Sequence, residues 1–169
     1  MLPLPKRYFL TAAACEGSTA LNAFDGALLK ARVGNTNLLR VSSILPPDCV
    51  YTPDLAIPAG SLLPIAYGTI SSDSPGTLIS AAVAVGKCSD GQYGLIMEYE
   101  GYCTRAEAKE RVLQMLQDGF TMRGLELKHT QVAACEHVVK KGLLLSGLSR
   151  DGIEEYLLRI TLRVLTILG

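Results

Sequence analysis

Short apolar segments separated by turn-forming residues occupy the chain between residues 37 and 139, and they limit the possible folds more than any other feature. Each segment has the length of a β-strand, and clusters of Gly, Ser, Asp and Pro, such as S-S-D-S-P-G at 71–76, separate them. Because strands and helical stretches do not alternate regularly, we expect an α+β fold of layered sheets and helices rather than a doubly wound sheet. The predicted strands are residues 37–45, 62–70, 79–85, 93–99 and 130–139.

The first predicted helix follows E-G-S-T at 16–19, where Ser18 or Thr19 can act as the N-cap. Apolar residues recur at helical spacing after it, and Gly34 is in the position that a left-handed C-cap prefers. Asp25 interrupts the apolar stripe, where an unpaired carboxylate is costly. Two interpretations stay open: Asp25 lies in solvent at the edge of the stripe, or its carboxylate faces a cationic ligand.

The second predicted helix starts with a capping box formed by Thr104 and Glu107, and Gly119 is expected to end it. Its buried face is predicted to consist of Val112, Met115 and Leu116.

The C-terminal segment has Asp151 and Glu154 in positions typical of a helix start, so we predict an amphipathic helix over residues 153–168. Arg159 and Arg163 interrupt its apolar residues, which are too few to span a bilayer. Prolines near the N-terminus argue against a signal peptide.

Composition argues against several functional classes. The formal net charge is +0 and no basic stripe is present, so no nucleic-acid partner is expected. Five widely spaced cysteines and two histidines make no metal-ligand pattern, so we expect no metal site and reduced thiols. We therefore expect a cytoplasmic protein with no membrane partner, folded as one domain over residues 1–169.

The segment G-L-I-M-E-Y-E-G at 94–101 alternates, so that Glu98 and Glu100 share one face of the predicted strand with Ile96. An acid on an apolar face is partly desolvated, which raises its pKa and lets it hold a proton near neutrality. Glu98 is therefore a candidate general acid, and the alternative is an exposed strand face.

The segment R-V-S-S-I-L-P-P at 40–47 ends a predicted strand with two hydroxyls and two prolines. The dipeptide itself carries little information, because Ser71–Ser72 repeats it. The chain has no phosphate-binding glycine loop and no G-x-S-x-G nucleophile motif. The Ser43 hydroxyl can attack the preceding carbonyl only where the backbone is strained and a donor holds the oxyanion.

The sequence resembles the pyruvoyl-dependent arginine decarboxylase family, in order and without large gaps from about residue 8 to about residue 142. The matching segments are E-G-S-T-A-L-N-A-F-D-G-A-L-L at 16–29, G-N-T-N-L-L-R-V-S-S-I-L-P-P at 34–47, P-I-A-Y-G-T-I-S-S-D-S-P-G at 64–76, G-L-I-M-E-Y-E-G at 94–101 and G-F-T-M-R-G-L-E-L at 119–127.

The resemblance implies a proenzyme that cuts itself between Ser42 and Ser43. The Ser43 hydroxyl attacks the Ser42 carbonyl to give an ester, and β-elimination then separates a β chain, 1–42, from an α chain, 43–169. Hydrolysis with loss of ammonia leaves a covalent pyruvoyl group at residue 43. Its ketone accepts the electrons released when L-arginine loses carbon dioxide to give agmatine, so neither pyridoxal phosphate nor a metal is expected.

The resemblance also implies roles for individual residues. Asn37 is expected to assist self-cleavage and position the substrate, Glu98 to protonate Cα, and Asp25 to pair with the substrate guanidinium. Gly34 and Thr36 are expected to supply backbone carbonyls to the guanidinium, and Leu38, Ile44 and Leu45 an apolar surround.

At the level of architecture, the resemblance implies a four-layer αββα sandwich that assembles as a trimer of cleaved protomers, or a dimer of trimers, with active sites between subunits. Two alternatives stay open. The chain is a pyruvoyl-dependent decarboxylase of another amino acid, such as histidine, or it is an uncleaved, inactive homologue with a structural or regulatory role.

Overall fold

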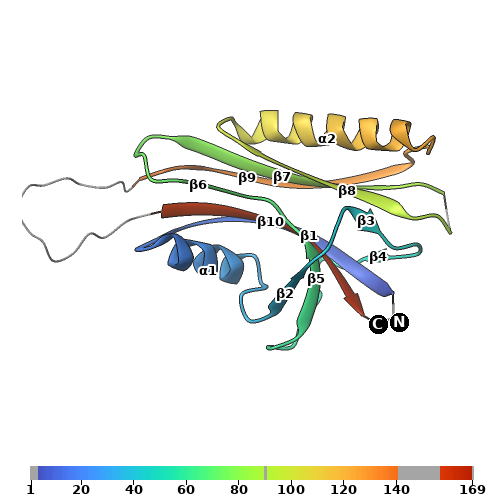
Figure 1. Cartoon of the computed structure of the whole chain (residues 1–169), viewed down its shortest axis with the longest axis horizontal. Coiled ribbons are helices and arrows are strands. Elements are labelled where there is room, and N and C mark those ends of the chain that lie inside the picture. The colour runs from blue at the N-terminus through green and yellow to red at the C-terminus, as the bar shows by residue number, and fades with distance from the viewer. Residues whose placement is uncertain (1–3, 90, 141–156, 169) are drawn as a thin grey trace, which may run out of the picture.

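Two helices and two β-sheets are stacked in four layers, in the order helix, sheet, sheet, helix (Figure 1). The computed structural model describes residues 4–89, 91–140 and 157–168. Helix α1 (Ala20–Lys30) covers the outer face of the first sheet, and α2 (Arg105–Met122) covers the outer face of the second. The predicted α+β fold is confirmed, and its layers follow the αββα order.

The first sheet has six strands of mixed direction, in the order β2-β5-β10-β1-β4, with β6 also paired to β10. Two pairings are parallel, β2 with β5 and β4 with β1, whereas β10 runs antiparallel to each of its partners. Strand β2 therefore forms one edge of this sheet. The six strands are β1 (Pro5–Gly17), β2 (Asn37–Arg40), β4 (Val50–Tyr51), β5 (Leu62–Ala66), β6 (Thr69–Ser72) and β10 (Leu157–Leu168).

The second sheet is fully antiparallel, in the order β3-β8-β7-β9, so the short strand β3 forms one of its edges. Its strands are β3 (Ile44–Leu45), β7 (Leu78–Lys87), β8 (Gly94–Gly101) and β9 (His129–Val138).

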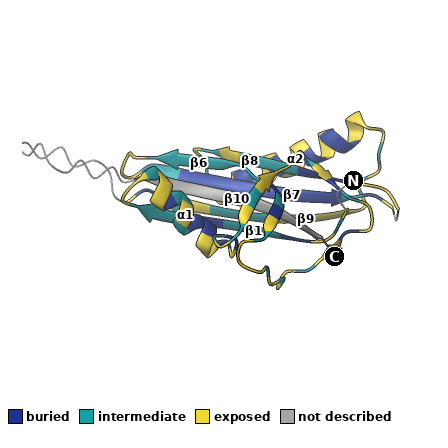
Figure 2. Ribbon diagram, turned by 60° about the horizontal axis from the view of Figure 1, so that its bottom comes forward, coloured by how far each residue is buried: buried dark blue, intermediate teal, exposed yellow. Residues whose placement is uncertain are grey.

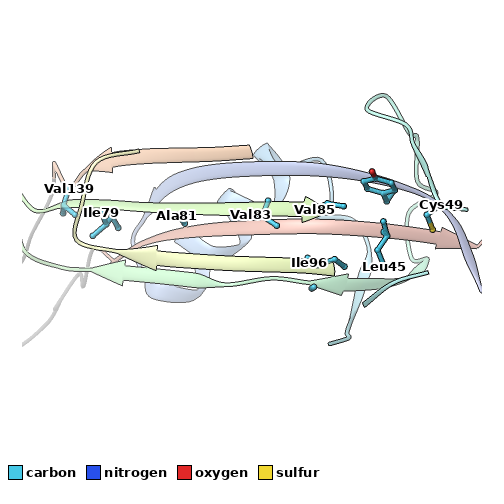
Figure 3. Packing of buried hydrophobic residues seen from close by; sticks show 10 residues of the cluster. Leu45, Cys49, Ile79, Ala81, Val83, Val85, Ile96 and Val139 are labelled. Carbon is cyan, nitrogen blue, oxygen red and sulfur yellow. The ribbon is translucent and has the colours of Figure 1, made fainter. Parts of the chain in front are cut away.

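Strand β7 is buried on both faces and supplies the centre of the core. Ile79, Ala81, Val83 and Val85 point into the cluster between the sheets, together with Ile96 of β8 (Figure 3). The alternate residues of β7, Ala82 and Ala84, pack with Leu116 and Phe120 under α2. Both helices bury one side and expose the other (Figure 2). This two-sided burial explains the continuous apolar sequence of β7.

Of the two predicted N-cap candidates, Thr19 caps α1, because its hydroxyl accepts a hydrogen bond from the Asn22 N–H (3.1 Å). Its predicted end at Gly34 is wrong. Arg32 takes the left-handed conformation (φ 63°), its N–H bonds to the Leu29 carbonyl, and the Val33 N–H bonds to the Leu28 carbonyl. These two bonds form a Schellman motif, so the helix terminates before Gly34 is reached.

Helix α2 has the predicted capping box, in which the Thr104 N–H donates to Glu107 Oε2 (2.8 Å) and the Glu107 N–H donates to the Thr104 hydroxyl. Gly119 does not end the helix. It is buried in the last turns, where an added Cβ would lie 2.6 Å from the Met97 methyl group, so it allows close packing on β8. The prediction of Met115 on the buried face is also wrong, since this side chain is 39% exposed.

The C-terminal segment is a strand, and the predicted helix over residues 153–168 is wrong. Strand β10 pairs with β1 along the whole of both strands, and with β5 and β6 on its other side. Its sequence alternates polar and apolar residues between 158 and 164, which is the period of a strand. Residues 153–156 of the predicted helix lie outside the described residues.

Strand β1 was not predicted from the sequence, although it is the partner of β10. Its sequence, P-K-R-Y-F-L-T-A-A-A-C-E-G, contains three consecutive alanines, a residue type depleted in strands. Tyr8 and Phe9 are nonetheless buried on opposite faces, Tyr8 between the sheets and Phe9 under α1. Pairing with two neighbours therefore overrides a weak local preference.

In a first test, Thr104→Ala is expected to lower the free energy of unfolding by about 1 kcal/mol, because it removes the N-cap of α2. Thr121→Ala is the matched control on the same helix. The exposed Thr121 hydroxyl donates to the Gln117 carbonyl within the helix and has no other hydrogen bond among the described residues, so its loss is expected to leave stability equal or slightly higher. Urea unfolding of both variants measures the difference, and equal losses would contradict the role of the cap.

Candidate active site

The Ser42–Ser43 peptide bond lies where the chain passes from one sheet to the other. The Val41 N–H donates to the Ile65 carbonyl of β5 (3.0 Å), which ties it to the first sheet. The Ser43 carbonyl accepts from the Ile96 N–H of β8 (2.9 Å), which ties it to the second. The predicted single strand over 37–45 is therefore wrong: β2 and β3 belong to different sheets, and the two serines join them.

The bond is also accessible and its two flanks are held separately. Ser42 is exposed and Ser43 is half-buried, whereas Leu45, two residues further on, is fully buried between the sheets (Figure 3). Neither serine has a positive φ, a conformation that in the described residues only Arg32 and Asp48 adopt outside glycine. The site is thus distinguished by its anchoring rather than by left-handed backbone.

Glu98 lies on β8 close to this crossover. Strand β3 pairs with the start of β8, which sets Ser43 opposite Ile96, and Glu98 follows two residues later on the same face as Ile96. Ile96 belongs to the core between the sheets, whereas the alternate residues Met97 and Tyr99 pack toward α2. The predicted alternation of this segment is confirmed, and it turns Glu98 toward the space between the sheets.

Several groups shift the pKa of Glu98. Desolvation by burial raises it most, and the negative charge of Glu100 raises it further, while the positive charge of Arg40 acts in the opposite direction. Its pKa is raised overall, as expected for a partly desolvated acid. The role of Glu98 as a proton donor stays a prediction.

Sequence reasoning assigned no role to Arg40 and Glu100, whose charges act on Glu98, or to Tyr67, which contacts Arg40. The Arg40 guanidinium stacks over the Tyr67 ring, with 5.0 Å between the guanidinium carbon and the ring centroid. The Arg40 charge also lowers the pKa of Glu100, although burial raises it overall. The sequence pattern could have pointed to Glu100, because it shares the strand face of Glu98. It could not have pointed to Arg40, because the position of Arg40 depends on the separation of β2 from β3.

Asn37 starts β2 and is turned toward a neighbouring loop. Its side-chain amide donates to the Gly60 carbonyl (2.9 Å), and its backbone N–H donates to the Ser61 carbonyl (2.8 Å). Among the described residues, Asn37 has no hydrogen bond to Ser42 or Ser43. Within one chain the Asn37 amide is therefore bonded to the loop at Gly60 rather than to the serines, and the role assigned to Asn37 stays a prediction.

The predicted guanidinium-binding residues lie on or after α1. Asp25 is exposed on this helix, on the outer side of the first sheet, whereas Glu98 belongs to the second sheet (Figure 1). Gly34 packs against Leu29, and the Thr36 hydroxyl donates to the Val33 carbonyl (2.8 Å). One chain thus does not unite these residues with Ser43 and Glu98.

The residues expected to form an apolar surround, Leu38, Ile44 and Leu45, do not lie together either. Leu38 is half-buried in the cluster under α1, together with Phe24 and Tyr67, whereas Ile44 is 43% exposed on the edge strand β3. In the described part of the chain, no group of three or more His, Cys, Asp or Glu side chains could hold a metal ion.

Comparison with known proteins shows to which family this chain belongs. A family model described as pyruvoyl-dependent arginine decarboxylase matches residues 7–152. The chain belongs to this family. It is 51% identical over 139 residues to the pyruvoyl-dependent arginine decarboxylase of Methanocaldococcus jannaschii, an alignment that covers 82% of this chain and 84% of the relative. Relatives with the same description from Pyrococcus abyssi and Thermococcus kodakarensis are each 49% identical and cover 80% of this chain and 87% of their own length.

The pyruvoyl group that gives the family its description fits the surroundings of residue 43. Pairing of Ile44 and Leu45 with β8 holds the backbone directly after this residue. The carbonyl of residue 43 itself is hydrogen-bonded to the Ile96 N–H. A new chain end at residue 43 would therefore stay fixed on the strand that carries Glu98.

The raised pKa of Glu98 is testable in the uncleaved chain. In a Ser43→Ala background, we expect the Glu98 carboxyl carbon to titrate at higher pH than that of Glu107, whose pKa is lowered by hydrogen bonds from Thr104. Titration by 13C NMR, with the Glu98 signal assigned through its absence in Glu98→Gln, measures both midpoints. A Glu98 midpoint at or below that of Glu107 would show that burial does not control this acid.

Proposed function

We propose that this chain is a pyruvoyl-dependent decarboxylase that converts L-arginine to agmatine and carbon dioxide. The observation that carries the proposal is the position of Ser43, at a crossover between two sheets and on the strand register that leads to Glu98. Membership of the pyruvoyl-dependent arginine decarboxylase family supports the choice of arginine.

The first step is maturation of the chain itself. The Ser43 hydroxyl attacks the Ser42 carbonyl, the resulting ester is eliminated, and the domain becomes two chains, 1–42 and 43–169. Separate anchoring favours this step, because Val41 stays bonded to β5 and Ile44 stays paired to β8 when the bond between them is cut. Neither end needs to refold after cleavage.

In the mature protein, the pyruvoyl group supplies a ketone that accepts the electrons left when the substrate carboxylate departs. The residues of the chain bind the substrate and control protons. Glu98 delivers a proton to Cα, and its raised pKa keeps the carboxyl group protonated to a higher pH than that of an ordinary glutamate. The rate is therefore expected to be high below the pKa of Glu98 and to fall as the pH rises through it.

Substrate binding requires a second copy of the chain. Asp25 is exposed on α1 and, as a carboxylate, is suited to a bidentate pair with the guanidinium of arginine. We place it in the active site of a neighbouring protomer, in a trimer or a dimer of trimers. Leu39, Val41 and Ile44, which are 46%, 37% and 43% exposed on or between the edge strands β2 and β3, support a contact there.

No helix in the described residues is long and apolar enough to cross a membrane. We place the protein in the cytoplasm, which the odd number and wide spacing of its cysteines favour.

Self-cleavage and substrate choice are tested together. Intact-mass measurement is expected to show two fragments for the natural chain, the larger beginning with a pyruvoyl group, and one uncleaved species for Ser43→Ala. Ser72→Ala, in the second Ser-Ser pair, is the matched control and should cleave normally. Carbon dioxide release is expected from arginine and not from histidine, lysine or ornithine.

Two outcomes would reject parts of this proposal. A single intact species under all conditions would identify an inert homologue. Release from histidine but not from arginine would assign a different substrate.

Sharing of the active site between copies is tested by complementation. We expect Asp25→Asn and Glu98→Gln chains to be inactive alone, because each lacks one required carboxyl group. Co-expressed in equal amounts, they should regain about a quarter of the natural sites, since a quarter of neighbouring pairs combine an intact Asp25 with an intact Glu98. Native mass spectrometry checks that mixed trimers form, and inactive mixed trimers would refute a shared site.

A further inference from the structure

Arg40 is the last residue of β2 and stands three residues before Ser43. Its guanidinium lies over the face of Tyr67, a geometry in which the ring quadrupole attracts the cation. Strand β2 pairs with β5 up to Arg40 and Ile65, so the backbone beneath the side chain is fixed as well. The Arg40 guanidinium is therefore held in position both by the Tyr67 ring and by the pairing of its backbone with β5.

The connection between β5 and β6 brings Glu100 to the same place. Gly68 follows Tyr67 directly, and a Cβ at position 68 would clash with the Glu100 carboxylate. This close approach is possible because glycine has no side chain. The same short connection thus supports the Arg40 guanidinium and leaves room for the Glu100 carboxylate.

Glu100 and Glu98 share one face of β8, and the positive charge of Arg40 acts on both carboxyl groups. On the paired strand β7, Val83 lies opposite Glu98 and Ala81 lies opposite Glu100, and neither of these two residues carries a charge. The Glu100 charge favours the protonated form of Glu98, and the Arg40 charge favours the ionised form. The charges of Glu100 and Arg40 therefore shift the pKa of Glu98 in opposite directions.

We propose that Arg40 is a positioning residue, whose positive charge partly offsets the negative charge of the neighbouring carboxyl groups of Glu98 and Glu100. Because Arg40 stands just before the self-cleaving segment, it links that segment electrostatically to the acid on β8. The charge balance is a property of the folded chain; only its meaning for catalysis rests on the proposed function. Arg40 acts through Glu98 and need not touch the substrate.

The direct test is the titration of Glu98 by 13C NMR in the uncleaved Ser43→Ala chain. Arg40→Gln is expected to raise the Glu98 midpoint by about half a pH unit or more, and Glu100→Gln to lower it by a similar amount. Arg40→Lys should stay near the parent value, because it keeps the charge. Opposite shifts from the two charge removals are a result that a general loss of structure does not produce.

Arg111→Gln is the matched control. Arg111 of α2 stacks over the ring of Tyr99, with 5.6 Å between the guanidinium carbon and the ring centroid. Tyr99 lies on β8 but points to the face opposite Glu98, so removal of the Arg111 charge should leave the Glu98 midpoint unchanged. Circular dichroism checks folding, and Arg40→Met replaces Arg40→Gln if the latter does not fold. Shifts of the same sign from Arg40→Gln and Glu100→Gln, or no shift from either, would overturn the proposal.

Activity gives an independent readout in the cleavable chain. The pH at which arginine decarboxylation declines should move upward in Arg40→Gln and downward in Glu100→Gln, because the rate requires protonated Glu98. A natural chain that releases no carbon dioxide from arginine would refute the proposed function. The NMR titration would still decide the role of Arg40.

Discussion

The passage of the chain between two sheets at Ser42–Ser43 is the constraint on which the rest of the site depends. One flank is fixed by the bond from Val41 to Ile65, and the other by the bond from Ile96 to Ser43. A fully buried Leu45 then locks β3 into the core between the sheets. The two layers thus hold the ends of a single, partly exposed peptide in place, so a chemical change at that peptide would leave the packing of both layers intact.

The same crossover brings together charges that are distant in sequence. The Arg40 charge acts on Glu98 and Glu100 from the end of β2, which lies beside the connection that carries Tyr67 and Gly68. An acid buried without such a partner would stay protonated over a wide range, and one in solvent would lose its proton well below neutrality. For Glu98, burial and the Glu100 charge raise the pKa and the Arg40 charge opposes them, so the surrounding charges adjust an acid that burial favours in its protonated form.

Local patterns predicted the parts of the fold that local interactions determine. The capping residues Thr19 and Thr104 and the alternation of β8 follow from contacts within a few residues. The failures concern choices made by distant partners. Strand β1 forms in spite of its alanines because β10 and β4 pair with it, and the strand predicted over 37–45 is split because each half finds a different sheet. Arg32 rather than Gly34 ends α1, and there its side chain stacks on Phe9 of β1.

The second serine pair shows why the dipeptide alone could not identify the site. Ser71 and Ser72 lie within β6, and both pair in register with β10, so the peptide between them belongs to one continuous ladder. Cutting it would break that ladder. At Ser42–Ser43 no ladder crosses the bond, since the residues before it pair with β5 and those after it pair with β8. Whether a Ser-Ser peptide can be cut without loss of the fold is therefore decided by the sheets on either side of it, and this information is contained in the long-range pairing rather than in the two residues.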